Sequence, residues 1–457
     1  MSYKVVVIGG GPGGYAAAIR AARMGARVAL VEKGNVGGAC LNWGCIPTKA
    51  LAAGVSALRT IHRAKDFGID TGEVSVDFSR LMERKDQVVS RLVQGVEFLL
   101  KKNKVDLFKG AARLSGSGRV LVTGTDGSLE LEAENIILAT GTEPALIKDF
   151  GYDGDMVITS NEALNLAGAP GRLVVIGGGV IGSEFACIFS ALGSKVTVAE
   201  IMPAILSLMD KDVSRQMQSL MKRQGISIRT RVKIQEIRKT DLVTVVLEGG
   251  EEILADKVLI SIGRVISLTG LGLEAAGVLV GDRGQVLVND RMETTVSGIY
   301  AIGDITGKIQ LAHVASAQGL VAVDNIMGHS RLMDYRVVPS CIFTHPEVAG
   351  VGLTTQEAES SGIKIKTGKF SFVGSGKAQA MGETDGFVKV LADPETDRIL
   401  GVHIVGPHAT DLIAEAALAM QAGVTVKQLA ETIHAHPTLA ESLLEAAGAV
   451  HGMSIHM

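Results

Sequence analysis

The chain has 457 residues, of which 47% are hydrophobic and 20% are charged, and its formal net charge is −3 at pH 7. This length predicts two to four domains, and the charge gives no reason to expect nucleic acid or an anionic membrane as partner. No run reaches the ~18 apolar residues of a membrane span. The N-terminus has no signal-peptide pattern, because an apolar strand is already predicted at residues 5–8. Four cysteines are too few for a secreted disulfide framework. We therefore expect a reducing, cytoplasmic compartment.

The first motif is a glycine-rich turn after an all-apolar strand. Gly9 is expected to allow the tight turn, Gly11 to let the backbone approach a diphosphate, and Gly14 to let helix and strand pack closely. Glu32 follows 18 residues after Gly14, at the place of an acid that binds ribose hydroxyls. Strand, turn, helix, strand and acid together predict a dinucleotide site.

A close pair of cysteines, Cys40 and Cys45, comes directly after this motif. A zinc site would need about four ligands, and Cys187 and Cys341 are single and lie in apolar surroundings. Two inert buried thiols are a second possibility. A redox-active dithiol is the interpretation that we favour, because a dithiol beside a bound cofactor can exchange two electrons with a thiol substrate.

The two cysteines are expected to differ. Trp43-Gly44 interrupts a regular helix, and Pro47 suits the first turn of a new one. That places Cys45 at a helix N-terminus, where the dipole lowers a thiol pKa, and leaves Cys40 for attack by an incoming thiol. Lys49, one turn further on, could add positive charge or could be a solvated lysine.

A second fingerprint repeats the first. Residues 173–200 match residues 5–32 at 11 positions without a gap, with Gly177, Gly179 and Gly182 in the glycine positions and Glu200 as the acid. Glu200 would repel a 2′-phosphate, and Ile201-Met202 supply no arginine to hold one. We therefore predict a second dinucleotide site that prefers NAD to NADP.

The other elements are predicted by periodicity and turn residues. Residues 105–137 are expected to form a strand meander, and 336 onward a separate α+β domain. Helices are predicted at 51–65, 79–102, 211–224, 409–421, 426–432 and 439–448, and strands near 136–141, 227–238, 243–247, 258–262, 299–304, 368–373, 386–392 and 399–404.

The C-terminal region contains two histidine–proline clusters. His434-Ala435-His436-Pro437 is followed by Glu441, a carboxylate that could orient an imidazole for acid–base work. His345-Pro346-Glu347 is similar. The pattern alone barely separates the two clusters.

These motifs together resemble the class I pyridine nucleotide–disulfide oxidoreductases over essentially the whole chain. The shared segments are Gly37–Lys49, Ala139–Pro144, Gly177–Glu184, Ser261–Arg264, Ala301–Asp304, Leu311–His313, Thr344–Glu347 and His434–Glu441.

The resemblance implies FAD in the first site and NAD in the second. It implies that His436 is the acid–base group, presented to the cysteines of the other subunit, and that Glu441 orients it. Cys40 would exchange with substrate and Cys45 would contact the flavin. Lys49 would pair with Glu184 beside the isoalloxazine, and His345 would be structural.

The same resemblance implies further cofactor contacts and a domain order. The expected FAD contacts include Gly110, Thr140, Gly141, Asp304, Leu311 and Ala312, and the expected NAD contacts include Val232 and Gly263. The expected fold is α/β, with two Rossmann-like domains and a C-terminal α+β dimerisation domain. Its expected boundaries are 1–145 for FAD, 146–264 for NAD, 265–335 for a central domain and 336–457 for the interface domain.

The implied activity is oxidation of a protein-bound dihydrolipoyl group with NAD as acceptor, a contribution to cell redox homeostasis. The implied partners are a second copy of the chain and a lipoyl domain of a 2-oxoacid dehydrogenase complex or of glycine cleavage. A mercuric- or glutathione-type reductase and a non-catalytic flavoprotein subunit are the alternatives. No metal site is expected.

Three departures from the family pattern leave the local shape and the flavin potential open. They are Val265-Ile266-Ser267 after Arg264, Val314 in place of a common lysine, and Gln318 in place of a common acid.

Overall fold

The computed structural model describes residues 2–125 and 127–456, and the chain divides into two compact units. Unit 1 gathers the residues up to 51 with 77–145 and 263–334, and unit 2 gathers 52–76, 146–262 and the residues from 335 on. Each unit is therefore assembled from segments that lie far apart in the sequence. The four-part domain division expected from the sequence stays a prediction.

Unit 1 is built on a sheet in the order β3-β2-β1-β6-β5-β4, with β17 beside β6. The first four strands of this order run parallel, and the second half of β6 pairs with both β1 and β17. Strands β4, β5 and β6 form the predicted antiparallel meander. The strands are β1 Ser2–Ile8, β2 Val28–Glu32, β3 Asp106–Lys109, β4 Ala111–Gly116, β5 Arg119–Gly124, β6 Gly127–Leu138, β17 Ile299–Ala301 and the separate pair β7 Thr142–Pro144 and β16 Arg264–Ile266.

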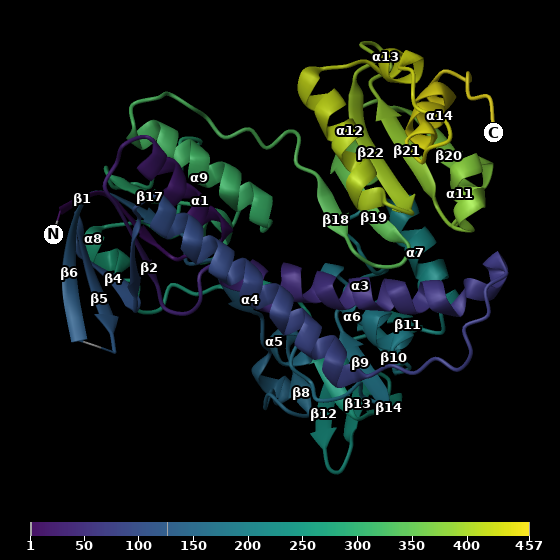
Figure 1. Ribbon diagram of the computed structural model, residues 1–457, viewed down its shortest axis with the longest axis horizontal. Coiled ribbons are helices and arrows are strands. Elements are labelled where there is room, and N and C mark those ends of the chain that lie inside the picture. Colours follow the sequence, from purple (N-terminus) through teal and green to yellow (C-terminus); the bar gives the residue numbers. More distant parts are fainter. Residues whose placement is uncertain (1, 126, 457) are drawn as a thin grey trace. The chain divides into compact units, whose positions relative to one another are not determined.

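Two helices of unit 1, α1 (Pro12–Arg23) and α9 (Ala312–Ile326), lie side by side against this sheet (Figure 1). Small residues allow their close approach, because a Cβ on Gly13 would lie 2.8 Å from the carbonyl oxygen of Ala315. The remaining helices are α2 Gly38–Trp43, the start of α3 Cys45–His62, α4 Phe78–Lys102, α8 Leu273–Ala276 and the 3-10 turn η3 Gly303–Thr306.

The second fingerprint lies in a parallel sheet of unit 2, in the order β11-β10-β9-β15-β8. Its central strands are buried, so their sequences are nearly continuous apolar runs. An antiparallel sheet, β12-β13-β14, accompanies it. The elements are β8 Val157–Ile158, β9 Arg172–Ile176, β10 Lys195–Glu200, β11 Ser227–Thr230, β12 Ile234–Lys239, β13 Val243–Leu247, β14 Glu252–Ala255, β15 Lys257–Ile260, α5 Ser160–Ala163, α6 Val180–Ala191, α7 Lys211–Arg223, η1 Ala64–Phe67 and η2 Lys148–Phe150.

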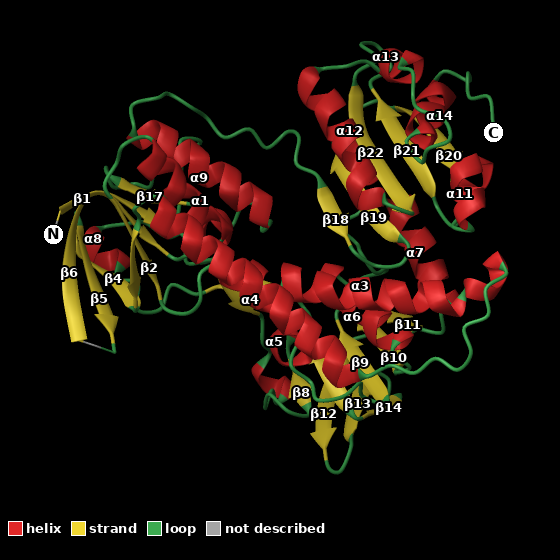
Figure 2. Cartoon of the chain, in the orientation of Figure 1, coloured by secondary structure: helices red, strands yellow, loops and turns green. Residues whose placement is uncertain are grey.

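The C-terminal part of unit 2 is the predicted α+β region. Figure 2 shows its antiparallel sheet, β18-β19-β22-β21-β20, with helices packed against it. Helix α12 contacts β19 and β22, while α14 contacts β20 and β21. The elements are β18 Ser340–Ile342, β19 Glu347–Gly352, β20 Lys366–Ser371, β21 Phe387–Ala392, β22 Ile399–Gly406, α10 Thr355–Ser360, α11 Gly376–Met381, α12 Ala409–Ala422, α13 Val426–Glu431, α14 Glu441–Val450 and η4 Phe372–Gly374.

The predicted fold class is confirmed, with two glycine-rich α/β regions and a C-terminal α+β region. Most of the predicted elements lie within a few residues of their expected bounds. Among the residues that the structure describes, none of the helices combines the length and the apolar character needed to cross a bilayer.

Candidate functional site

The first glycine-rich turn connects β1 to α1. Gly9 has a φ of +104°, which favours glycine, and a Cβ on it would lie 2.3 Å from the carbonyl oxygen of Ala139. A Cβ on Gly14 would lie 1.9 Å from the carbonyl oxygen of Gly9. Gly11 caps α1, and a Cβ there would meet only the Cα of Gly38, at 3.9 Å. Gly9 and Gly14 thus lie where the turn, the helix and the strand pack closely and a side chain would not fit. Gly11 borders open space at the helix N-terminus, where a diphosphate fits.

Glu32 occupies the predicted acid position at the end of β2. Its Oε2 accepts a hydrogen bond from the Gly10 N–H at 2.7 Å, and its Oε1 accepts one from the Gly34 N–H at 2.8 Å. An ionised carboxylate has about four lone-pair sites, so these bonds leave capacity for ribose hydroxyls. The sequence pattern does not reveal the backbone of Gly10 as the partner that orients this acid.

The second turn repeats this geometry between β9 and α6. Gly177 has a φ of +102° and a Cβ on it would lie 2.5 Å from the carbonyl oxygen of Ser261. A Cβ on Gly182 would lie 1.9 Å from the carbonyl oxygen of Gly177, the same value as in the first turn. Gly179 caps α6, and a Cβ there would meet no described atom within 4 Å. Both turns therefore have room at the helix end for a phosphate group.

Glu200 is the acid of the second turn, and its side chain is buried. Its Oε2 accepts from the Gly178 N–H at 2.6 Å, and its Oε1 accepts from the Met202 N–H at 2.7 Å. A buried carboxylate in this place disfavours a second anionic group. The geometry therefore agrees with the predicted preference for NAD over NADP.

Asp304, predicted to bind the FAD ribityl chain, lies in η3 after β17. Its Oδ2 accepts from the Thr142 hydroxyl at 2.8 Å, and that hydroxyl accepts from Arg264 Nε at 2.8 Å. Burial lowers the pKa of Arg264, whereas the charges of Asp304 and Cys45 raise it. A partly buried cation and a carboxylate thus lie in the surroundings of the dithiol.

The other predicted FAD residues lie at element ends of unit 1. Gly110 follows β3, and Thr140 and Gly141 follow β6, at the carboxyl ends of parallel strands. Leu311 caps α9, and Ala312 is its first residue. This is the sheet edge at which α/β folds bind dinucleotides.

The cysteine pair lies on a broken helix, as predicted. Cys40 is in α2, Gly44 ends that helix with φ −148° and ψ −105°, and Cys45 is the first residue of α3. Thr48 binds the Gly44 carbonyl oxygen through both its N–H (3.1 Å) and its hydroxyl (2.6 Å). These two bonds fix the start of α3 at the bend between the two cysteines.

The two thiols have unequal environments. A hydrogen bond with Cys45 is the main cause that raises the pKa of Cys40 far above its usual range, and burial adds to it. The positive charge of Lys49 acts in the opposite direction. Cys40 therefore holds its proton strongly when the pair is reduced.

Three other predicted residues are placed separately. Glu184 is buried in α6, and its Oε1 accepts from the Phe343 N–H at 2.8 Å. The Val232 N–H donates to the Glu200 carbonyl oxygen at 3.1 Å, directly beside the second acid. Gly263 has a φ of +126°. The ion pair between Lys49 and Glu184 stays a prediction.

The C-terminal cluster holds a histidine against a carboxylate. Nδ1 of His436 lies 2.8 Å from Oε1 of Glu441, and Oε2 of Glu441 accepts from the Thr438 N–H at 2.7 Å. The His436 side chain is 79% exposed, so its ring can reach a substrate or another chain. His434 differs, because its side chain is buried and its Nε2 lies 2.7 Å from Glu415.

The second histidine–proline cluster lies in a different environment. His345 is partly buried, and burial together with the charges of Arg59 and Arg63 lowers its pKa to about 4. Its carbonyl oxygen accepts from Gln224 Nε2 at 2.6 Å, and its backbone hydrogen-bonds the buried thiol of Cys187. A neutral histidine whose backbone is held by hydrogen bonds in this way is suited to a structural role.

The three departures from the family pattern have structural partners. Val265 lies in β16 and pairs with Glu143 of β7. Val314 is buried in α9, and the Gln318 side chain accepts from the Gly303 N–H at 2.6 Å, just before Asp304. Among the described residues, no three His, Cys, Asp or Glu side chains gather as a metal site would require.

Two family models match the chain. Residues 3–319 match the pyridine nucleotide-disulphide oxidoreductase family, and residues 338–447 match the dimerisation domain of that family.

Individual proteins agree with this match. The dihydrolipoyl dehydrogenase of Thermus scotoductus is 46% identical over 100% of this chain and 99% of its own, and one from Bacillus subtilis is 43% identical over 99% of both. Among solved structures, LpdA from Mycobacterium tuberculosis has a TM-score of 0.91 at 29% identity over 97% of this chain and 99% of its own. The flavoprotein disulfide reductase RclA from Escherichia coli, solved as a Cu(II) complex, has a TM-score of 0.90 at 30% identity over 98% of this chain and 99% of its own. The chain therefore belongs to the pyridine nucleotide-disulphide oxidoreductase family.

Proposed function

We propose that this protein oxidises a protein-bound dihydrolipoyl group to the lipoyl disulfide and reduces NAD to NADH. The observation that carries the proposal is the helix break at Gly44, which gives the dithiol two unequal members. One cysteine is at the first position of an 18-residue helix, where the helix dipole favours a thiolate. The other holds its proton strongly. Cys45 is therefore the resident thiolate and Cys40 the thiol that exchanges with substrate.

The cofactors of this family are FAD and NAD, as predicted. The first turn, with Gly11 and Glu32, would hold the FAD, and the second, with Gly179 and Glu200, the NAD. When bound, these cofactors supply the two-electron transfer from the dithiol to the nicotinamide. The fit rests on the open space that a Cβ would enter at Gly11 and Gly179.

The residues of the chain perform the thiol chemistry. His436, oriented by Glu441, takes a proton from a substrate thiol, and the resulting thiolate attacks the disulfide at Cys40. The bond between the two cysteines breaks, and Cys45 leaves as thiolate. The second substrate thiol then attacks the mixed disulfide, which forms the lipoyl disulfide and releases the sulfur of Cys40, and the proton of that second thiol passes to Cys40.

The same proposal assigns partners and a location. The match to a dimerisation domain and the exposed ring of His436 support a homodimer in which this histidine serves the cysteines of the other subunit. The relatives' name supports a lipoyl-bearing domain as the substrate carrier, and low cysteine content supports the cytoplasm.

The test is an anaerobic titration of the holoenzyme with dihydrolipoamide, followed in the flavin spectrum. Wild type is expected to develop a long-wavelength thiolate-to-flavin band and to turn over with NAD but not with NADP. Cys45→Ser is expected to lose the band and about 10³-fold or more of the rate. Cys341→Ser is the matched control, because that thiol is partly buried and contacts the Thr410 carbonyl oxygen.

A Cys45→Ser enzyme that oxidised dihydrolipoamide at the wild-type rate would contradict the proposal. Turnover of glutathione disulfide with NADPH, in place of dihydrolipoamide with NAD, would indicate a glutathione-type reductase. A holoenzyme that turned over none of these substrates would indicate a non-catalytic flavoprotein subunit.

A further inference from the structure

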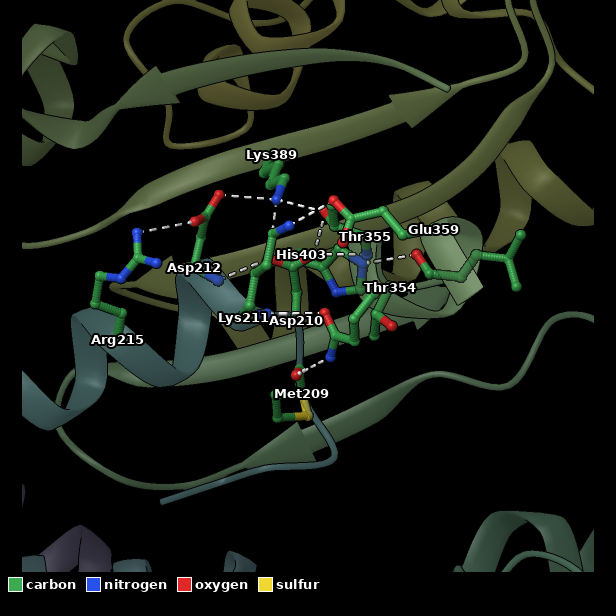
Figure 3. Close-up of polar contacts among 12 residues, drawn as sticks. Met209, Asp210, Lys211, Asp212, Arg215, Thr354, Thr355, Glu359, Lys389 and His403 are labelled. Atoms are coloured by element: carbon green, nitrogen blue, oxygen red, sulfur yellow. Dashed lines mark hydrogen bonds and ion pairs between the residues drawn. The ribbon is translucent and has the colours of Figure 1, made fainter. Parts of the chain in front are cut away.

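A buried polar cluster joins the nucleotide-binding and C-terminal parts of unit 2 (Figure 3). Lys389 of β21 points its ammonium toward the N-terminus of α7, where Nζ lies 2.9 Å from Asp210 Oδ1 and 2.8 Å from Asp212 Oδ2. It also donates to the Thr355 hydroxyl at 2.7 Å. Lys389, Asp210 and Thr355 are all buried, so water does not screen this contact. We call these three residues the anchor.

Asp210 uses both carboxylate oxygens in the anchor. Its Oδ2 accepts from the N–H of Thr355 at 2.9 Å and from the hydroxyl at 2.6 Å, and its Oδ1 accepts from the Asp212 N–H at 2.9 Å as the cap of α7. Burial acts to raise the pKa of Asp210, but these bonds and the hydrogen bond from Lys389 outweigh it and lower that pKa. The start of α7 is therefore fixed by residues of the C-terminal region.

The segment before Asp210, residues 201–209, borders the second glycine-rich turn. The Leu206 N–H donates to the carbonyl oxygen of Gly178 at 2.8 Å. A Cβ on Gly178 would lie 2.6 Å from Cγ2 of Ile205. At its other end the segment continues from Glu200, which binds the N–H groups of both Gly178 and Met202. Movement of this segment would move the turn and its acid.

Leu206 is held in an unfavourable conformation. Its φ is +50°, in the left-handed region that favours glycine, and its side chain is buried. Such a residue persists only where its surroundings hold it. Ser214 of α7 donates to the Leu206 carbonyl oxygen at 2.8 Å, and Gln356 Nε2 donates to the Met209 carbonyl oxygen at 2.7 Å. Both contacts lead back to the elements that the anchor joins.

We propose that Asp210 and Lys389 are positioning residues for the nicotinamide nucleotide. The anchor fixes α7, α7 holds residues 201–209 over the second turn, and this segment sets the shape of the turn that receives the diphosphate. This inference rests on the proposed function, in that the second turn is taken as the NAD site. It adds that a lysine 189 residues after Glu200 controls the affinity for NAD without contacting it.

The test compares two lysine variants that remove a contact between the same two regions. Lys389→Met breaks the buried anchor. Lys211→Met breaks the ion pair of Lys211 with Glu359, which also joins α7 to α10 but is exposed, and exposed pairs contribute little. Purified holoenzymes are titrated with NADH, and KM for NAD, KM for dihydrolipoamide and the rate of flavin reduction by dihydrolipoamide alone are measured.

Lys389→Met is expected to raise the NADH Kd and the KM for NAD about 10-fold or more, because it leaves the buried carboxylate of Asp210 without a countercharge. KM for dihydrolipoamide and the flavin reduction rate are expected to stay within about two-fold of wild type, and so are all parameters of Lys211→Met. The double variant Asp210→Asn/Lys389→Met is expected to recover part of the affinity, because it removes the uncompensated charge and keeps a capping oxygen.

Thr355→Val provides a milder break if Lys389→Met does not fold, with a smaller rise in the NADH Kd as its expected result. Unchanged NADH binding in the folded anchor variants would overturn the inference. Equal losses in the nucleotide and dithiol reactions would overturn it too, because they would indicate general structural damage. A wild-type enzyme that bound no NADH would overturn both the proposed function and this inference. If the wild-type enzyme turned over dihydrolipoamide with NAD and the anchor variants bound NADH as tightly as wild type, the inference alone would be overturned.

Discussion

The two histidine–proline clusters share a sequence pattern and differ in environment. Both have a cis His–Pro peptide and a glutamate close behind it. Glu441 reaches its histidine, His436, whereas Glu347 turns to α12, where Oε2 accepts from the N–H (3.0 Å) and the hydroxyl (2.8 Å) of Thr410. The ring of His436 is exposed, and that of His345 is partly buried with a pKa lowered to about 4. The partner and the exposure of the ring thus distinguish the histidine that we propose as the acid–base group, and the motif alone does not identify it.

The strongest test of this comparison is the same substitution in both clusters. His436→Gln is expected to lower kcat for dihydrolipoamide oxidation by about 10²- to 10⁴-fold, the usual contribution of a general base. His345→Gln is expected to keep kcat within about three-fold, because its ring has no part in the proton transfer. Steady-state NAD reduction at saturating substrate measures both. Comparable losses in the two variants would remove the distinction.

A smaller effect is expected from the carboxylates. Glu441→Gln replaces the acceptor at Nδ1 of His436 with an amide, so kcat is expected to fall by about 10- to 100-fold, as when other orienting groups of a histidine are lost. Glu347→Gln is the matched control, with kcat near wild type and a lower melting temperature from the weakened contact with Thr410. The pH–rate profile of Glu441→Gln is also measured. An unchanged rate and profile would show that Glu441 has no orienting role.

The smallest effect concerns stability against pH. The folded-state pKa of His345 is about 4, below the ~6.5 of an unfolded histidine, so the unfolded chain binds more protons between these values. The contribution of His345 to stability is complete above pH ~6.5 and is lost as the pH falls toward 4, by at most about 3 kcal/mol. Denaturant unfolding of wild type and His345→Gln at pH 7 and pH 5 measures the loss in free energy of unfolding between these pH values. An equal drop in both proteins would exclude His345 as the cause.

Features governed by local rules could be predicted from the sequence. The glycine spacing identified both turns, which agree to the same 1.9 Å approach at Gly14 and Gly182. Trp43-Gly44 and Pro47 predicted the broken helix that separates the two cysteines. These features depend on φ, on missing side chains and on helix ends, and each is set by a few neighbouring residues.

Features that depend on tertiary contacts could not be predicted in this way. The bond between His436 and Glu441 was expected from a family resemblance and from a five-residue spacing, and spacing alone did not favour it over His345-Pro346-Glu347. The partners of Glu32 and Glu200 are backbone groups of Gly10 and Gly178, which sequence patterns do not reveal. The ion pair of Asp210 and Lys389 spans 179 residues, and no local pattern marks either residue.

The anchor also limits how this enzyme can be recombined with its relatives. Its acid comes from the nucleotide-binding segment, and its base and hydroxyl come from segments after residue 335. A chimera that takes its C-terminal region from another protein must therefore supply a lysine at position 389 and a hydroxyl at position 355. Crossover points that separate Asp210 from these residues leave its buried carboxylate without a cation, whereas crossovers that transfer residues 201–457 as one block keep the set together.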